Sequence, residues 1–387
     1  MRGAAGPIAA LLLLGAPSSV AAGWLPVGDV EVTREESELG GGRLTIEYRL
    51  EAEGITADEP AWVFLRLSRD GGATWSPLGP GDLRGSGHGI VERPGRKTSH
   101  LWGLDALGLT GPESPLVAVR AVAMVRVPGG EFHARAVPGG GYDDSRLGGG
   151  VSHVDSFSIG QHEVTLSMYA DYLGEVGATG AGWHPRLSDP DRGGLVQEGD
   201  PWAYTYRVSP GRESHPVAFV SWYDARAFLE WCGLRLPTEA QWEKAVRGGV
   251  WLDGDDAQTH RNPLPDRRYP WGDEAPDANG VFRCNLDGDA DGFPHTAPVG
   301  SFARFTSPYG IWDLAGNVAE WTRERYTTSY HADLDGFRIL RGGSWMSLPE
   351  GVDAVTGATR LPLKRSAAVG FRGVHEKQGR GRGRDAP

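Results

Sequence analysis

A short acidic run is the part of this sequence whose spacing points most directly to metal chemistry. Asp287, Asp289 and Asp291 alternate with small residues and precede Gly292, which is the D-x-D-x-D-G spacing of the first half of an EF-hand loop. Such a loop holds Ca²⁺ because this ion prefers six to eight hard oxygen ligands. The twelfth loop position is Pro298, where an EF-hand has glutamate, and no helical pattern flanks the run. The sequence therefore argues against an EF-hand but favours Ca²⁺ binding near this run.

The two cysteines offer little redox or zinc chemistry. Cys232 and Cys284 are 52 positions apart, which is neither a Cys-x-x-Cys redox motif nor a zinc-ribbon spacing. A structural disulfide and a pair of buried free thiols both remain open interpretations.

Helices that could position these residues are predicted after residue 164. Ser221 can cap a helix over residues 221–232, where apolar residues recur at helical spacing. Thr238 and Gln241 form the capping box of a second helix. A weaker pattern predicts a third helix over residues 165–173.

The first hundred residues after the N-terminal segment have a different pattern. Residues 24–122 are predicted to form a small all-β sandwich of the Ig-like or fibronectin-like type, because strand-length apolar segments alternate with Gly/Pro-rich turns. These segments are residues 30–32, 43–50, 61–67 and 116–122.

The N-terminus has the pattern of a secretory signal peptide over residues 1–22. Arg2 gives a positive start, residues 8–14 are apolar, and cleavage is predicted near Ala22. No later apolar run is long enough to cross a membrane, so no transmembrane segment is predicted. We therefore expect a periplasmic or secreted protein.

The charge of the chain limits its partners. A net charge of −11 gives no reason to follow a phosphate backbone, so nucleic acid is not an expected partner. The basic stretch at residues 377–384 is predicted to be part of a solvated, disordered tail over residues 377–387.

An ordered series of short motifs resembles the formylglycine-generating enzyme family, whose members are also called sulfatase-modifying factors. In chain order the motifs are Val125–Phe132, Phe157–Thr165, His215–Val217, Ser221–Trp222, Arg235–Ala245, Tyr269–Gly272, Pro298–Phe302, Tyr309–Trp321, Arg341–Trp345 and Gly370–Arg372. Each motif is weak alone, but the ordered set is specific. The resemblance implies an α+β, C-type-lectin-like fold with little regular secondary structure over residues 123–376. Such a fold suits a chain with 58 Gly, 27 Pro and 14 Trp.

The resemblance also indicates which chemistry is missing. The family's oxidases carry two cysteines, five residues apart, after a Gly-Gly-Ser-aromatic motif. Their thiolates bind Cu(I), a soft ion, and a sulfatase cysteine is oxidised with O₂. In this chain the motif ends at Trp345, and Ser347 and Val352 stand at the two cysteine positions. Copper and formylglycine formation are therefore not expected. No two of the 11 histidines are four positions apart, so the iron site of the related ergothioneine-type sulfoxide synthases is absent too.

The resemblance implies two Ca²⁺ sites. The first would use the side chains of Asn285 and Asp291 and the carbonyls of Leu286 and Phe293. The second would use the side chains of Asp313 and Glu320 and the carbonyls of Gly316 and Val318. Irregular backbone of this kind has carbonyl oxygens to offer a hard cation.

The sequence leaves three functional hypotheses. The one we adopt is an exported, non-catalytic, calcium-braced module that binds a secreted or envelope protein, peptide or glycan in a groove near Trp345, Met346 and Ser347. The second is an oxidative modifying enzyme of a secreted peptide or siderophore, like the pyoverdine-maturation proteins. The third is a structural component of an envelope assembly. Whether the chain is an enzyme thus stays undecided by its sequence.

Overall fold

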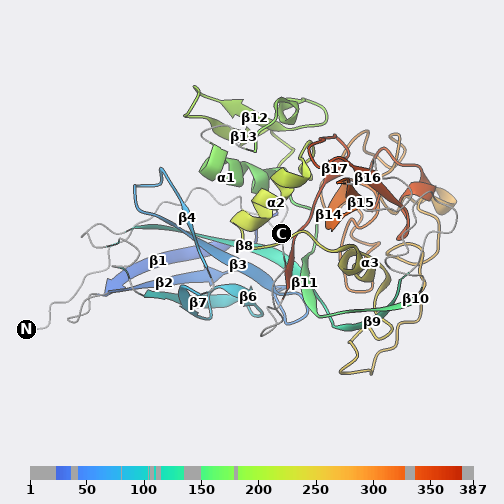
Figure 1. The fold of residues 1–387 in the computed structure, drawn as a ribbon, viewed down its shortest axis with the longest axis horizontal. Helices are drawn as coiled ribbons and strands as arrows, with labels where there is room; N and C mark the ends of the chain where they lie inside the picture. Colours follow the sequence, from blue (N-terminus) through green and yellow to red (C-terminus); the bar gives the residue numbers. More distant parts are fainter. Residues whose placement is uncertain are drawn as a thin grey trace, which may run out of the picture.

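The computed structural model describes residues 23–35, 42–79, 81–102, 104, 109, 115–134, 150–177, 182–326 and 336–376. The predicted signal peptide and the basic tail lie outside these residues. Figure 1 shows long strands in the N-terminal half and loops with few helices in the rest. The strands are β1 (Val27–Glu35), β2 (Arg43–Leu50), β3 (Ala61–Ser68), β4 (Ser76–Leu78), β5 (Leu83–Gly85), β6 (Gly89–Val91), β7 (Gly95–Trp102), β8 (Leu116–Val127), β9 (Gly130–Ala134), β10 (Gly150–Val154), β11 (Phe157–Gly160), β12 (Leu195–Glu198), β13 (Thr205–Val208), β14 (Ala319–Arg325), β15 (Arg338–Arg341), β16 (Gly357–Arg360), β17 (Val369–Gly370) and β18 (Val374–Glu376). The helices are α1 (Leu166–Val176), α2 (Trp222–Trp231) and α3 (Glu239–Arg247).

The N-terminal strands form two sheets that share one hydrophobic core. One sheet has the order β1-β2-β7-β5, and the other contains β4, β3 and β8, with β6 also paired to β3. Side chains of β2, such as Ile46, and of β3, such as Val63 and Leu65, lie in the same buried cluster. The four predicted strand segments all lie within β1, β2, β3 and β8.

Strand β8 connects this region to the rest of the molecule. Its residues 116–123 pair with β3, and its residues 124–127 pair with β11, which in turn pairs with β18. The boundary expected near residue 122 therefore falls inside a strand. The sheet β4-β3-β8-β11-β18 runs without a break from one region into the other.

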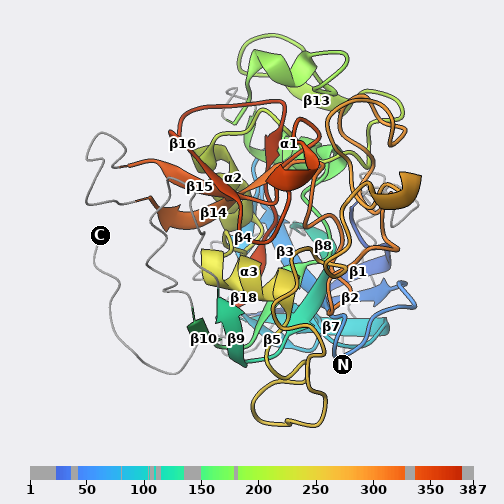
Figure 2. The same ribbon diagram turned by 90° about the vertical axis from the view of Figure 1, so that its right-hand side faces the viewer.

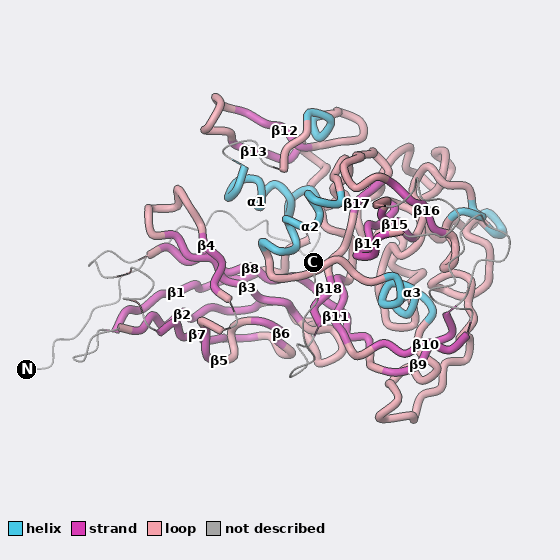
Figure 3. The backbone as a smooth tube through the Cα atoms, in the orientation of Figure 1, coloured by secondary structure: helices cyan, strands magenta, loops and turns pink. Residues whose placement is uncertain are grey.

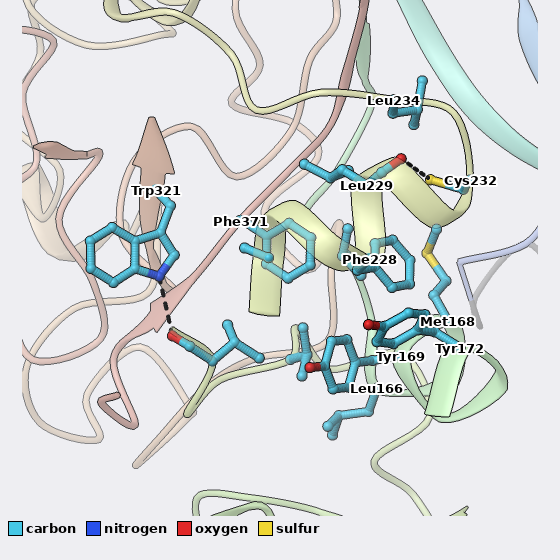
Figure 4. Packing of buried hydrophobic residues seen from close by; sticks show 14 of the residues in the cluster. Leu166, Met168, Tyr169, Tyr172, Phe228, Leu229, Cys232, Leu234, Trp321 and Phe371 are labelled. Atoms are coloured by element: carbon cyan, nitrogen blue, oxygen red, sulfur yellow. Dashed lines mark hydrogen bonds between the residues drawn. The ribbon is translucent and has the colours of Figure 1, made fainter. Parts of the chain in front are cut away.

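Strand β3 is buried along its whole length because both of its faces are covered. Val63 and Leu65 point into the N-terminal core, whereas Trp62 and Phe64 belong to the cluster formed by α1 and α2. Figure 4 shows the core of this second cluster, where Tyr169 of α1 and Phe228 of α2 stack at 5.8 Å. A strand covered on both sides needs a continuous apolar sequence rather than an alternating one.

All three predicted helices are confirmed. Ser221 and Asp224 form a capping box at the start of α2, and Thr238 and Gln241 form one at the start of α3. The third predicted helix is α1, for which Thr165 is the N-cap and which extends to Val176, three residues past the expected end.

The rest of the fold is rich in loops. Residues 248–318 contain a three-residue 3₁₀ turn and isolated bridges but no strand or longer helix (Figure 3). After this stretch the chain forms the curled sheet β16-β15-β14-β17. Figure 2 shows β14, β15 and β16 above α3 on this side of the molecule. Few helices, short curled sheets and long loops agree with the α+β architecture expected for residues 123–376.

Candidate functional site

Two loops that are far apart in the sequence meet at Gly316. Gly316 has a φ of +74°, and a Cβ atom there would lie 2.1 Å from the carbonyl oxygen of Asn285. Only glycine allows this approach. The neighbouring Asp313 and Asn317 also have positive φ values, of 53° and 56°. The amide of Asn317 donates to the Asn285 carbonyl at 3.1 Å, which joins the two predicted calcium-binding segments.

A cluster of buried and partly buried carboxylates lies around one arginine next to this junction. The Arg372 guanidinium donates from Nε and NH2 to the Glu320 carboxylate at 2.7–2.8 Å. Its NH2 also donates to the carbonyl of Asp313 at 3.1 Å. The indole of Trp242 donates to Glu320 Oε2 at 3.1 Å, and the amide of Gly300 donates to Asp313 Oδ2 at 2.6 Å.

The structure adds Glu163 to this cluster, a residue that the sequence reasoning did not assign to the site. Glu163 is fully buried, and its carboxylate accepts hydrogen bonds from Asn317 Nδ2 at 2.9 Å and from the amide of Val318 at 3.3 Å. The residue lies in the motif Phe157–Thr165, so its position was visible. The signal that could have identified it was a single charged residue, Glu163, next to the apolar Val164 in this motif.

The carboxylates of this cluster outnumber the positive charges that contact them. Burial, and then the nearby Asp313 carboxylate, raise the pKa of Glu163 well above its usual range. Burial raises the pKa of Asp313 to about 6. In the described part of the chain, Arg372 is the basic side chain that contacts the cluster. Two buried acids, Glu163 and Glu320, and the partly buried Asp313 share one guanidinium, which leaves an excess of negative charge that a divalent cation could balance.

The other predicted calcium-binding segment has an acceptor without a partner. Asn285 is fully buried, and its Nδ2 donates to the carbonyl of His295 at 2.8 Å, but its Oδ1 has no hydrogen-bond partner. Asp291 shapes the same loop, since its carboxylate accepts from the amides of Leu286 at 2.7 Å and Phe293 at 2.9 Å. A buried, unpartnered amide oxygen suits a hard cation.

Side chains alone do not form a metal cage here. Among the described residues, no group of three or more His, Cys, Asp or Glu side chains converges closely enough to hold a metal ion. A Ca²⁺ ion would therefore depend on carbonyl ligands as well, which are the groups predicted at Leu286, Phe293, Gly316 and Val318.

The two positions that carry cysteines in the family's oxidases lie together in space. A Cβ atom at Gly343 would lie 2.7 Å from Val352 Cγ1 and 3.1 Å from Ser347 Oγ. The Ser347 hydroxyl accepts a hydrogen bond from the amide of Ser344 at 3.0 Å, and Val352 is fully buried. The side chains at these two positions thus lie close together, and neither of them is a thiol.

The actual cysteines do not replace the missing pair. Cys232 and Cys284 are both buried and are not joined by a disulfide. The structure therefore agrees with the interpretation of two buried free thiols and not with that of a structural disulfide. Burial raises the pKa of Cys232 to about 12 and raises the pKa of Cys284 further. Thiols with such raised pKa values form thiolates only at high pH, so they are poor metal ligands and nucleophiles at neutral pH.

The three residues of the predicted groove lie in one turn but differ in exposure. Trp345 is mostly buried; its indole donates to the carbonyl of Ala367 at 3.1 Å, and its ring lies 4.9 Å from that of His295. Met346 is 57% exposed beside Ser347. Trp345 therefore braces the turn, and Met346 presents apolar surface to solvent.

The chain is similar to several known proteins over about two thirds of its length. A family model described as "Sulfatase-modifying factor enzyme 1-like domain" matches residues 113–377. The formylglycine-generating enzyme of Streptomyces coelicolor is 32% identical over 291 residues, which cover 64% of this chain and 87% of the relative. "Inactive C-alpha-formylglycine-generating enzyme 2" of Bos taurus is 39% identical over 166 residues, 41% of this chain and 49% of the relative. The solved structure of PvdO from Pseudomonas aeruginosa has a TM-score of 0.44 and 22% identity over 66% of this chain and 94% of its own.

The loop-rich α+β fold and the match to the family model over residues 113–377 thus define a protein with the scaffold of a sulfatase-modifying factor. The chain belongs to the formylglycine-generating enzyme, or sulfatase-modifying factor, family. The match begins at residue 113, so strands β1–β7 precede the family region. None of the helices in the described residues is long and apolar enough to cross a membrane.

Proposed function

We propose that this protein is a non-catalytic member of the family, which binds a protein, peptide or glycan at the surface around Met346 and Ser347. The observation that carries this proposal is the convergence of Ser347 and Val352 on Gly343. These are the positions where the family's oxidases hold Cu(I). A serine hydroxyl is a hard, weak ligand at neutral pH, and a valine side chain is no ligand.

The relative from Bos taurus supports a non-catalytic role. Its name describes it as inactive, and it is 39% identical to this chain over 166 residues. Because the family has a member named as inactive, this scaffold could likewise serve for binding in a chain that lacks the two copper-binding cysteines.

Calcium is the ion that this scaffold would use as a brace. A hard divalent cation fits two features of this region. One is the excess of negative charge from the carboxylates of Glu163, Asp313 and Glu320, and the other is the unpartnered oxygen of Asn285. The first site would be held by Asn285, Leu286, Asp291 and Phe293, and the second by Asp313, Gly316, Val318 and Glu320. Glu163 would lie beside the second site and hold Asn317 and the Val318 amide in place. The ion would balance buried charge and hold the two loops together, and it would take no part in a reaction.

Export completes the proposal. The signal-peptide pattern of residues 1–22 supports a periplasmic or secreted location, where millimolar Ca²⁺ can fill modest sites. The N-terminal sheets would act as an Ig-like or fibronectin-like adaptor for the family region. Sequencing the N-terminus of the protein recovered from its native host tests this part, and a chain that still begins at Met1 would contradict it.

Elemental analysis of the purified protein tests the proposal as a whole. Without added metals, we expect near-stoichiometric Ca and no Cu or Fe. The double variant Ser347→Cys/Val352→Cys should gain the capacity to bind Cu(I), because the two side chains already converge on Gly343. Stoichiometric Cu or Fe in the unmodified protein, or O₂ consumption with a cysteine-containing peptide, would show that the site is not redox-inactive.

A further inference from the structure

A cavity of about 570 Å³ lies where the N-terminal sheets meet the family region. One wall is the turn before β3, with Asp58 and Glu59. A second wall is the loop after α3, with Asp253, Asp256 and His260. The cavity is completed by Arg126, Pro128, Gly129, Ser156, Leu252, Gly254, Pro308 and Tyr309. Because Asp58 and Glu59 precede residue 113, the family region alone would not form it.

Hydrogen bonds fix both walls. The amide of Arg126 donates to the carbonyl of Asp58 at 2.7 Å, and the amide of Glu59 donates to Thr56 Oγ1 at 3.0 Å. In the loop after α3, the amide of Thr259 donates to Asp253 Oδ2 at 2.9 Å. The walls are therefore in place before any ligand arrives, which lowers the entropy cost of binding.

The cavity carries unbalanced negative charge. None of its four carboxylates, those of Asp58, Glu59, Asp253 and Asp256, forms an ion pair with another described residue. The Arg126 guanidinium is already paired with Glu92 at 2.6 Å, outside the cavity lining. Four carboxylates with no counter-charge of their own give a cavity that attracts cations.

The spacing of these charges favours an extended organic cation over a metal ion. No three acidic or imidazole side chains among the described residues converge as metal ligands would. The volume falls in the range of ligand pockets, roughly 300–1,000 Å³. Leu252, Pro308 and the ring of Tyr309 provide apolar surface for the aliphatic stem of a lysine or arginine side chain, whose charged end can reach a carboxylate.

We propose that this cavity binds a basic peptide segment through lysine or arginine side chains. It shares no residue with the surface around Ser347, so it would be a second binding site. Two sources offer this chemistry. One is a partner polypeptide, and the other is the basic stretch 377–384 of this chain, which follows Glu376; Glu376 pairs with Phe157, the neighbour of the lining residue Ser156.

Fluorescence anisotropy with a labelled peptide of sequence GRGRGR tests the proposal on the full chain at low ionic strength. The variant Asp58→Asn/Glu59→Gln should weaken binding at least about tenfold, because it removes two of four charges from one wall. The control Glu31→Gln/Glu53→Gln removes the same net charge from exposed positions outside the cavity, and binding should stay within about twofold. Thermal unfolding of each variant checks that the fold is kept.

A third variant, Arg380→Gln/Arg382→Gln/Arg384→Gln, separates the two sources. Binding by the unmodified chain supports a partner segment, and binding only after this triple substitution supports the chain's own basic stretch. The proposal is overturned when neither protein binds the peptide, or when the cavity variant and the charge-matched control lose affinity equally. The neutral peptide GQGQGQ should not bind any of them.

Discussion

The acidic residues of the family region show how a few side chains set what this scaffold can hold. Glu163 and Glu320 are buried and Asp313 is partly buried near Arg372, and a compact domain does not keep such an excess of negative charge without cost. Protonation of Glu163 and Asp313 is one way to reduce it, and a bound divalent cation is another. The unpartnered Asn285 oxygen nearby favours the cation.

Removal of calcium should therefore destabilise the protein through these residues. With a chelator, we expect the melting temperature to fall by several degrees and to recover when Ca²⁺ is added. The variant Asn285→Ala should reduce this calcium-dependent shift by at least about half, because it deletes the unpartnered oxygen. Differential scanning calorimetry with and without Ca²⁺ measures both effects.

Asp289→Asn is the matched control for this prediction. Asp289 stands in the same loop but contacts Gly292 through its backbone carbonyl, and it is not one of the proposed ligands. It should keep most of the calcium-dependent shift. Equal melting temperatures with chelator and with Ca²⁺ in the unmodified protein would contradict the calcium brace.

A second residue, His215, should control stability at mildly acidic pH. Burial, and then the charge of Arg212, lower the pKa of His215 from 6.5 to about 4, while its ring contacts Thr296 Oγ1 at 3.1 Å. The unfolded chain binds the proton first, so the free energy of unfolding should decrease as pH falls from about 6.5 to 4. The variant His215→Gln should flatten this part of the profile by on the order of 2 kcal/mol. The exposed His153→Gln, measured in the same urea titrations, should leave it unchanged.

At the scale of elements, the start of α3 links local sequence to the carboxylate cluster. Thr238 Oγ1 accepts from the amide of Gln241 at 3.1 Å, and the next residue, Trp242, donates to Glu320. The variant Thr238→Ala should cost about 1 kcal/mol of unfolding free energy, because the helix loses its N-cap acceptor. Thr238→Ser keeps the oxygen and should stay within a few tenths of a kcal/mol of the unmodified protein in urea denaturation. An unchanged Thr238→Ala protein would show that the cap is dispensable.

The helices were predictable because their signals are local. Capping residues and apolar periodicity at Ser221 and Thr238 lie within one turn of the element that they define. The role of β8 was not predictable in this way. Its apolar pattern indicates a strand, but its two partners, β3 and β11, are set by packing between residues tens of positions away.

The site was predictable in its motifs and not in its network. Asp313, Glu320 and Asn285 were assigned from the family resemblance, and the structure brings their loops together. Glu163 and Arg372 lie in motifs that were seen, but their contact with the cluster depends on the path of β11 and of the chain before β18. The spacing of residues in the sequence does not show that Glu163 and Arg372 contact this cluster.

At the scale of the whole molecule, the two regions behave as one packed body. Trp62 of β3 donates to the carbonyl of Cys232 at 2.7 Å, and Trp24 lies 6.3 Å from the ring of Trp231 at the end of α2. Arg66 and Arg120 of the N-terminal sheets each lie 5.5 Å from the centre of the Trp231 ring. We call these contacts around Trp231 and Cys232 the seam between the two regions. Because the regions share a sheet as well as this seam, they could not separate without exposing a hydrophobic core.

Glu175 of α1 tests that view, because it holds both arginines of the seam. Its carboxylate lies 3.0 Å from Arg66 and 2.7 Å from Arg120, and Arg66 and Glu175 are almost fully buried. Glu175→Gln leaves two positive charges poorly balanced and should cost about 3 kcal/mol, with both regions still unfolding in one transition. Glu230→Gln breaks an exposed pair with Arg226 on α2 and should cost less than about 0.5 kcal/mol. Calorimetry with circular dichroism and tryptophan fluorescence measures these values, and two separate transitions in the unmodified protein would show that the regions fold independently.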